Sequence, residues 1–315
     1  MSGKKKRAPL VRTILLMFIG FSTVFVLFNF PYHWDPQPKN VKRVAQAVPT
    51  GAKANGFYSD VYAPADSGEA GKVSDSAYVQ SVSAHSDDVK KAIRGFVRLY
   101  HLADKKVLDV GAGSGYLQDA VENYTGLDIV PEAARYFHKK FVVGSATDMP
   151  FADGEFDALW TIWVLEHVPN PERALAEMRR VVKPGGYLFL APAWNVPSWL
   201  SGGYDVQPYS AFGWQGKLIK ASIPMRKLRL ADGMYLGQIR MLRHLASLVG
   251  PTRLRYHLLN PNYETYWEHD SDAVNSIDPY EVYLWHLSRG DRCLNCGDFR
   301  RALWSPPIAL IIQKQ

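Results

Sequence analysis

Cysteine is scarce in this chain of 315 residues, which has only Cys293 and Cys296, in a single Cys-x-x-Cys pair. A zinc site built on such a pair needs a second pair of ligands, and none is evident, although His269 or His286 could lie near in space. The scarcity argues against a zinc-binding fold, and we predict no metal site. We expect two reduced thiols on a strand or turn near the C-terminus rather than a redox pair.

Charge is absent from Thr13 to Phe30. As a helix this run is about 27 Å long, close to the hydrocarbon thickness of a bilayer. Basic residues precede it, and Tyr32 and Trp34 follow where an interfacial aromatic belt would lie. A cleavable signal peptide is the alternative, but its apolar region would be unusually long, and Ala45–Ala47 lies too far downstream as a cleavage site. Residues 1–34 are therefore predicted to be a basic N-terminus and a transmembrane helix that contacts membrane lipids.

A third glycine is missing from the pattern that binds dinucleotides. Val107–Val110 predicts a buried strand, Gly111, Gly113 and Gly115 predict a turn that a ligand can approach closely, and Tyr116–Asn123 predicts a helix. The dinucleotide pattern G-x-G-x-x-G requires glycine at position 116, where this chain has tyrosine. The loop therefore suits a nucleoside better than a pyrophosphate, which disfavours a nicotinamide-dependent oxidoreductase.

Strands and helices alternate after this loop, which is the pattern of a doubly wound, mostly parallel α/β sheet. Tyr124–Ile129 predicts a second strand, and Asp128 near its end can accept both hydroxyls of a ribose. The alternation stops after the fifth strand and restarts at Asp278-Pro279, so residues 193–277 form an insertion beside the carboxyl edge of the sheet. The other predicted elements are helices over Asp87–His101, Pro131–Lys139, Pro171–Val181 and Asp278–Gly290, and strands over Phe141–Val143, Ala158–Ile162, Tyr187–Ala191, Arg292–Cys296 and Ile308–Ile312.

The segment between the apolar run and the sheet has no such alternation. Pro, Gly, Ala, Ser and Asp are frequent there, which predicts a flexible tether over residues 35–84 and a folded domain over residues 85–315. Tyr58 and Tyr62 are the points at which we expect the tether to dock.

Five motifs follow one another along residues 85–192. They are Asp109-x-Gly111-x-Gly113-x-Gly115; Asp128; Met149–Asp157, which reads like LPFxDGxFD; Leu165–Val168, which reads like LEHV; and Val182–Gly186, which reads like LKPGG. In order and spacing they resemble the motifs of class I S-adenosylmethionine-dependent methyltransferases with a type 11 methyltransferase-like domain. The resemblance implies a Rossmann-like fold, S-adenosylmethionine as the cofactor, and methyl transfer as the reaction.

The same resemblance implies a set of cofactor-binding residues. The family usually has Gly-Asp-Ala after the third strand, where this chain has Gly144-Ser145-Ala146. Either Asp148 reaches the adenine amine, or the Ser145 hydroxyl and the backbone replace the missing acid. The implied cofactor-binding residues are Asp109, Gly111, Gly113, Gly115, Asp128, Ser145, Ala146 and Asp148.

Methyl transfer from a sulfonium is an in-line displacement, and an alcohol acceptor also needs a base. We predict His167, His269 and Asp270 as catalytic residues. His167 follows the fourth strand, at the edge where acceptors bind in this family; its alternative is a structural role at a helix start. The other two lie in the acidic run Glu264–Asp272, where Trp267 could stack on a sugar; the alternative is a solvated loop, and the spacing of the acids is too mixed to claim a metal.

The insertion is basic and aromatic, which behind a membrane anchor suggests anionic lipid headgroups or a phosphate-bearing substrate. A solvated basic surface is the alternative. We expect no nucleic acid as a partner, because no RNA-binding module is visible. The basic residues are Arg226, Lys227, Arg229, Arg240, Arg243, Arg253 and Arg255.

The predicted function is methyl transfer from S-adenosylmethionine to a hydroxyl of a glycan or lipid-linked acceptor. The alternative is a non-catalytic S-adenosylmethionine-binding module, for which Ser145 is the only support. Five positive charges before the apolar run and three after it favour an external domain, whereas the cofactor is made in the cytosol. We give more weight to the cofactor and expect a single-pass membrane protein with a cytoplasmic catalytic domain.

Overall fold

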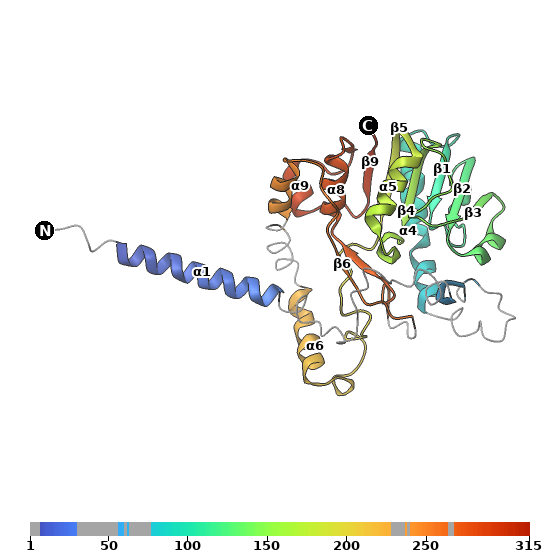
Figure 1. The fold of residues 1–315 in the computed structure, drawn as a ribbon. Coiled ribbons are helices and arrows are strands. Elements are labelled where there is room, and N and C mark those ends of the chain that lie inside the picture. Colours follow the sequence, from blue (N-terminus) through green and yellow to red (C-terminus); the bar gives the residue numbers. More distant parts are fainter. Residues whose placement is uncertain are drawn as a thin grey trace.

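The computed structural model describes residues 7–29, 56–59, 62, 77–227, 237, 240–263 and 268–315. At its centre is a seven-stranded sheet in the order β3-β2-β1-β4-β5-β9-β8 (Figure 1). Strands β1 to β5 pair in parallel, β9 pairs antiparallel with β5, and β8 antiparallel with β9. This confirms the predicted mostly parallel sheet. The strands are β1 (Lys106–Val110), β2 (Asn123–Asp128), β3 (Lys140–Val143), β4 (Phe156–Ile162), β5 (Val182–Ala191), β8 (Arg292–Cys293) and β9 (Leu310–Gln313).

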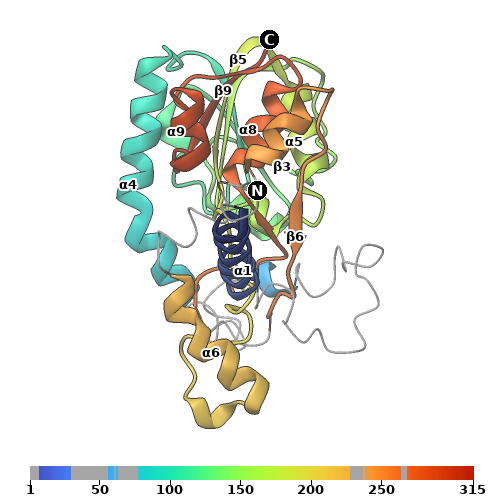
Figure 2. The ribbon, with the colours of Figure 1, turned by 90° about the vertical axis from the view of Figure 1, so that its left-hand side faces the viewer.

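Helices cover both faces of the sheet, with α4 on one face and α5 and α8 on the other (Figure 2). Successive strand residues point to opposite faces, so Val107 packs in the core with Ile93 of α4, while Leu108 packs in the core with Leu175 of α5. Both faces are apolar because both are covered, as in other parallel sheets. The helices are α4 (Ala77–Leu99), α5 (Pro171–Val181), α8 (Pro279–Leu287) and α9 (Phe299–Trp304).

Two predicted helices are wrong in type or extent. The helix predicted over Tyr116–Asn123 is a single 3₁₀ turn at Gln118–Ala120, and β2 already begins at Asn123. The few residues after Gly115 must also reverse the chain toward β2, which leaves room for one turn only. The helix predicted over Pro131–Lys139 is a 3₁₀ helix over Pro131–Tyr136.

The N-terminal apolar run lies in α1 (Arg7–Asn29), whose side chains from Val11 to Phe21 are exposed wherever the structure describes them. Within the described part of the chain, no helix combines the length and the apolarity needed to cross a bilayer. The predicted transmembrane helix is therefore not supported. Tyr32 and Trp34 lie outside the described residues.

The insertion holds α6 (Trp214–Arg226) and a two-stranded antiparallel sheet of β6 (Tyr256–Leu258) and β7 (Asn275–Ile277). Two of its arginines, which we expected to face lipid or phosphate, pair with the start of α8 instead. Arg240 Nη2 lies 2.7 Å from Asp278 Oδ2, and Arg243 Nε lies 2.7 Å from Glu281 Oε1. Asp278 also caps α8, as the sequence predicts, by accepting a hydrogen bond from the backbone N–H of Tyr280. These ion pairs dock the insertion on the core.

The two cysteines are joined in a disulfide, so the prediction of two reduced thiols is wrong. The Cα atoms of Cys293 and Cys296 lie 5.6 Å apart, within the usual span of a disulfide. The pair closes the turn that follows β8. Sequence spacing alone did not fix this distance, because two intervening residues can be extended or folded back.

Candidate active site

The glycine loop leaves β1 at the carboxyl edge of the sheet. Gly111, Gly113 and Gly115 have φ angles of 75°, 51° and 68°, in the left-handed region that favours glycine. The Gly111 N–H donates a hydrogen bond to the Leu127 carbonyl at 2.8 Å, which holds the loop against β2. A Cβ atom on Gly113 would lie 2.7 Å from the Tyr62 hydroxyl, so this position leaves no room for a side chain.

Asp128 joins the end of β2 to this loop. Its Oδ2 accepts a hydrogen bond from the Gly113 N–H at 2.9 Å, and its Oδ1 accepts one from the Val130 N–H at 3.0 Å. Burial raises the pKa of Asp128, and these backbone donors oppose that shift. Each carboxylate oxygen keeps further lone pairs for a ligand. The geometry is therefore compatible with the predicted binding of ribose hydroxyls.

Asp109 lies deeper, inside β1. It is 4% exposed and accepts a hydrogen bond from the Tyr124 hydroxyl at 2.8 Å. Burial raises the pKa of its carboxyl to about 7, although the Tyr124 hydrogen bond opposes the shift. The first residue of the glycine motif thus helps to fix the position of β2, in addition to its predicted contact with the cofactor.

The predicted adenine end is a tight turn after β3. The Asp148 N–H donates a hydrogen bond to the Ser145 carbonyl at 3.1 Å, and the Ser145 and Thr147 hydroxyl oxygens lie 2.8 Å apart. The Gly144 N–H donates to the Asp128 carbonyl at 2.9 Å, so this turn lies beside the predicted ribose site. Ser145 and Ala146 are half-buried, whereas Asp148 is exposed.

Two tyrosines that precede the domain contact the site. Tyr62 lies over Gly113, and burial, followed by the charge of Asp128, raises the pKa of its phenol. The Tyr58 hydroxyl donates a hydrogen bond to Asp272 Oδ2 at 2.6 Å, and its ring lies edge-on to His167 with 6.1 Å between centroids. The tyrosines predicted as docking points therefore lie against the two predicted ligand sites.

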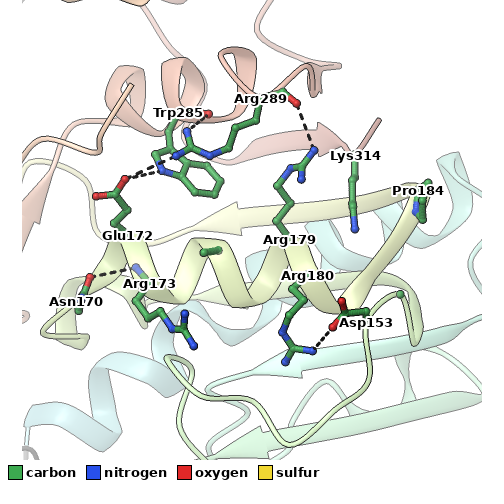
Figure 3. A pocket seen from close by; sticks show the side chains of 12 residues that line it. Asp153, Asn170, Glu172, Arg173, Arg179, Arg180, Pro184, Trp285, Arg289 and Lys314 are labelled. Carbon is green, nitrogen blue, oxygen red and sulfur yellow. Dashed lines mark hydrogen bonds and ion pairs between the residues drawn. The ribbon is translucent and has the colours of Figure 1, made fainter. Parts of the chain in front are cut away.

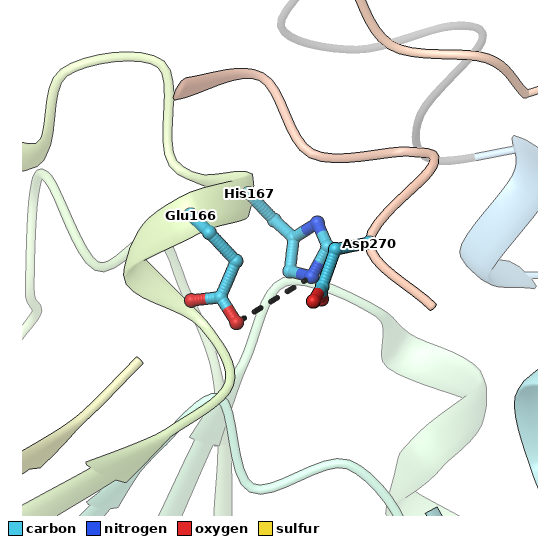
Figure 4. Close-up of side chains that lie close together, drawn as sticks. All are labelled: Glu166, His167 and Asp270. Carbon is cyan, nitrogen blue, oxygen red and sulfur yellow. Dashed lines mark ion pairs between the residues drawn. The ribbon is translucent and has the colours of Figure 1, made fainter. Parts of the chain in front are cut away.

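A cluster of ionisable side chains lies beyond the glycine loop, at the carboxyl end of β4 (Figure 4). It consists of Glu166, His167, Asp270 and Asp272, and we call it the Glu–His–Asp cluster. His167 Nε2 lies 3.9 Å from Glu166 Oε1, and His167 Nδ1 lies 3.3 Å from Asp272 Oδ2. Ligand-type atoms of Glu166, His167 and Asp270 all lie within 4.8 Å of one another.

Within the cluster Glu166 and Asp272 are buried, His167 and Asp270 are half-buried, and the electrostatics are unusual. Burial raises the pKa of Glu166 to about 7 and raises the pKa of Asp270. For His167, burial lowers the pKa, but the charges of Asp272, Glu166 and Asp270 raise it more, so the net shift is upward. Shifts of this kind are common where a protein moves protons.

The backbone around the cluster is also unusual. Among the described residues that are not glycine, four have a positive φ. One of them, Trp163 at 54°, lies just before the cluster, and another, Asp270 at 61°, belongs to it. Long-range hydrogen bonds bring the insertion to this place. The Val274 N–H donates to the Glu166 carbonyl at 2.9 Å, and the Asn275 side chain donates to the Leu165 and Val168 carbonyls at 2.8 and 2.7 Å.

The structure thus brings together two of the three predicted catalytic residues, His167 and Asp270. His269 is exposed and is not among the ligand-type atoms that meet there. Trp267 lies outside the described residues, as does Arg229 of the basic set. The sequence interpretation did not assign roles to Glu166 and Asp272, although the first stands in the LEHV-like motif and the second ends the acidic run.

A separate groove of about 790 Å³ lies along the outer side of α5 (Figure 3). Its cations already have partners: Arg179 pairs with Asp291, and Arg180 pairs with Asp153 and Glu177. Pro184, near the start of β5, and Asn170, at the start of α5, both line it, so the groove runs along the length of α5, and neither the glycine loop nor the Glu–His–Asp cluster lines it. We do not assign it to the reaction.

The fold and the glycine loop form an α/β domain with a predicted nucleoside site, and comparison with known proteins shows what this domain is similar to. Residues 108–190 match the family described as methyltransferase domain. The chain is 37% identical over 107 residues to a ubiquinone biosynthesis O-methyltransferase of Dechloromonas aromatica, covering 29% of this chain and 45% of that protein. It is 32% identical over 126 residues to a fatty-acid O-methyltransferase of Mycolicibacterium smegmatis, covering 33% and 46%.

Among solved structures, a S-adenosylmethionine-bound amino pentose methyltransferase of Micromonospora echinaspora is 22% identical, covers 35% of this chain and 51% of that chain, and has a TM-score of 0.31. The chain spans less than half the length of the two curated relatives. The match over residues 108–190 agrees with the class I S-adenosylmethionine-dependent methyltransferase motifs of the sequence, and it supports S-adenosylmethionine as the cofactor.

Proposed function

We propose that this protein transfers the methyl group of S-adenosylmethionine to a hydroxyl of a lipid-linked or glycan acceptor. The observation that carries this proposal is the position of the Glu–His–Asp cluster. A Cβ atom on Gly111 would collide with Val164, and Glu166 and His167 follow Val164 on the same loop. Groups that can accept a proton therefore lie next to the predicted cofactor site.

The reaction needs one proton transfer and one displacement. The acceptor O–H gives its proton to the cluster, its oxygen forms a bond to the methyl carbon, and the carbon–sulfur bond breaks with its electron pair going to sulfur. His167 suits the proton transfer because Asp272 lies on its Nδ1 side, which leaves Nε2, on the side of Glu166, for the acceptor proton. The charges of Asp272, Glu166 and Asp270 also stabilise the protonated form of the ring.

The proposed acceptor class has two supports. The two curated relatives are an O-methyltransferase of ubiquinone biosynthesis and a fatty-acid O-methyltransferase, which suggests an apolar molecule with a nucleophilic oxygen. The insertion beside the cluster exposes several apolar side chains, among them Trp214, Leu218 and Leu258, which could contact such a molecule.

His167→Gln tests the assignment of the base. We expect kcat to fall by about 10²–10⁴-fold, which is the usual contribution of general base catalysis, and the dissociation constant for S-adenosylmethionine to change little. The matched control is His138→Gln, because His138 is an exposed histidine that also pairs with a carboxylate, that of Asp119. An unchanged kcat in His167→Gln would remove this residue from the reaction.

The acceptor itself is found by incubating the purified chain with labelled S-adenosylmethionine and a lipid extract or a glycan fraction, followed by mass spectrometry of the labelled product. A labelled product in the lipid extract or the glycan fraction supports the proposal. Cofactor binding without any product in either fraction would support the non-catalytic alternative.

A further inference from the structure

We infer that the Glu–His–Asp cluster binds one divalent transition-metal ion, through Glu166, His167 and Asp270. That this site binds a metal ion is a claim beyond the proposed function and does not depend on it. Only the role of the ion in methyl transfer rests on the proposed function. The sequence predicted no metal, because the acids of the 264–272 run are irregularly spaced. The fold changes this conclusion by adding Glu166 and His167 from the loop after β4.

The first argument is a concentration of buried polar atoms that lack a partner. Glu166 and Asp272 are 1% and 0% exposed. Glu166 Oε2 and Asp272 Oδ1 have no hydrogen-bond partner within the described part of the chain, and neither has Ser271 Oγ. A buried carboxylate oxygen without a partner costs free energy, and such atoms normally mark a bound ion, water or ligand.

The second argument is charge. Three carboxylates face one imidazole in the cluster, and among the residues that the structure describes no lysine or arginine forms an ion pair with Glu166, Asp270 or Asp272. Buried carboxylates in proteins are paired with cations or coordinate metals. A divalent cation would supply the missing positive charge.

The third argument is orientation. Asp272 Oδ2 lies on the Nδ1 side of the His167 ring and also accepts a hydrogen bond from the Tyr58 hydroxyl. The other ring nitrogen, Nε2, faces Glu166 (Figure 4). Metal-binding histidines usually have a carboxylate on the side of their other ring nitrogen. Here Asp272 Oδ2 lies 3.3 Å from Nδ1, although the two atoms do not meet hydrogen-bond geometry.

The distances fit after a small contraction. The three ligand atoms lie within 4.8 Å of one another. Three atoms at this separation lie about 2.8 Å from their common centre, so each must move by less than about 1 Å to reach an ion with bonds of about 2.1 Å. One imidazole with two carboxylates suits Mn²⁺ or Zn²⁺ better than Mg²⁺, which prefers oxygen ligands.

Such an ion would change which group takes the proton in the proposed transfer. The acceptor hydroxyl would take an open position on the ion, which lowers the pKa of the hydroxyl. With Nε2 bound to the ion, the proton would leave to water rather than to His167. The displacement at the methyl carbon is unchanged.

In the experiment, the purified full chain is first freed of metal with a chelator and is then titrated with MnCl₂ in the absence of cofactor and acceptor. The electron paramagnetic resonance signal measures the Mn²⁺ that remains free. We expect one ion per chain, displaced by Zn²⁺. Asp270→Asn should weaken binding at least tenfold, and asparagine tolerates the positive φ of this position. Asp119→Asn is the matched control, since Asp119 also pairs with a histidine but on the surface.

Glu166→Gln is the second variant, and the thermal unfolding midpoint reports whether each variant is folded. The inference is overturned if the wild-type chain binds neither Mn²⁺ nor Zn²⁺ when protein and ion are mixed in equal amounts at concentrations up to millimolar. It is also overturned if a folded Asp270→Asn binds Mn²⁺ as tightly as the wild type. Cofactor binding is measured separately by calorimetry. Failure to bind S-adenosylmethionine would count against the proposed function and would leave the ion titration valid.

Discussion

The candidate site has a cofactor side and an acceptor side, and the buried carboxylates of the two sides differ in their hydrogen-bond partners. On the cofactor side, Asp109 accepts a hydrogen bond from a tyrosine, and Asp128 accepts two from backbone N–H groups. On the acceptor side, Glu166 and Asp272 each keep one buried oxygen without a partner in the described structure. The first half is complete as the chain folds it, whereas the second has the features of a site that a ligand or ion completes.

The two halves also differ in how they are assembled. The cofactor side comes from β1, β2 and β3, which are adjacent in the sheet and close in the sequence. The acceptor side joins the loop after β4 to a segment more than 100 residues later, through the Asn275 side chain and the Val274 N–H. The cofactor side is therefore held by neighbouring strands of the sheet. The acceptor side depends on contacts with the insertion, so a change in the insertion can alter the acceptor side without altering the cofactor side.

The largest expected effect tests the cofactor side. Asp128→Ala should weaken S-adenosylmethionine binding by about 10²–10⁴-fold, because two charge-assisted hydrogen bonds to ribose are lost, each worth roughly 1.5–3 kcal/mol. Isothermal titration calorimetry measures the change. Asp128→Asn is the companion variant, since its amide oxygen can still accept the Gly113 N–H while the charge is gone. A dissociation constant unchanged in Asp128→Ala would take this residue out of the site.

Much of the cofactor side could be predicted because its signals are local. The strand before the glycine loop, the position of Asp128 and the start of α8 at Asp278-Pro279 each depend on a few neighbouring residues. The failures are also instructive. The helix after the glycine loop was lost because the position of β2 limits the connection, and strand pairing is not visible in a single sequence.

The acceptor side could be predicted only in part. His167 and Asp270 were found because their residue types suit proton transfer, but nothing in the sequence joins residues 166–168 to residues 270–275. That contact depends on buried side-chain amides and on backbone hydrogen bonds in an irregular segment. The ion pairs of Arg240 and Arg243 with α8 were missed for the same reason, since both arginines look like surface charges when only the sequence is read.

A smaller effect is expected at the link between the insertion and the core. Arg240 is 6% exposed and pairs with Asp278, so Arg240→Ala leaves a poorly solvated carboxylate at the start of α8. Breaking a buried pair costs about 3 kcal/mol, and we expect a clear loss of stability in urea unfolding. The dissociation constant for S-adenosylmethionine should stay within about twofold if the two halves are independent.

Lys227→Ala is the matched control for this link, because Lys227 pairs with Asp205 at the surface of the same insertion. An exposed pair is worth about 0–1 kcal/mol, so this variant should unfold close to the wild type. Equal destabilisation by both variants would show that Arg240 has no special role in docking the insertion. A large loss of cofactor affinity in a folded Arg240→Ala would contradict the independence of the two halves.

The smallest effect concerns the charge of Asp109, which lies under the glycine loop. Its pKa in the folded protein is raised to about 7 by burial, so between the ordinary pKa of an aspartate and pH 7 the folded chain binds a proton that the unfolded chain has released. Stability therefore falls as the pH rises through this window.

Asp109→Asn removes the titration and keeps an oxygen to accept the Tyr124 hydrogen bond. We expect the thermal midpoint of the variant to exceed that of the wild type by about 2–4 °C at pH 8, the shift that about 1 kcal/mol gives in a domain of this size, and to differ less at pH 5. Asp157→Asn gives the opposite sign. Burial raises the pKa of Asp157, but the hydrogen bonds from Lys183 and the Lys106 N–H and the nearby lysine charges together lower it more, so its contribution to stability is lost on acidification rather than at high pH. Differential scanning calorimetry at the two pH values separates the two carboxylates, and a lower midpoint for Asp109→Asn at pH 8 would mean that Asp109 is charged in the folded protein and stabilises the cofactor side as an anion.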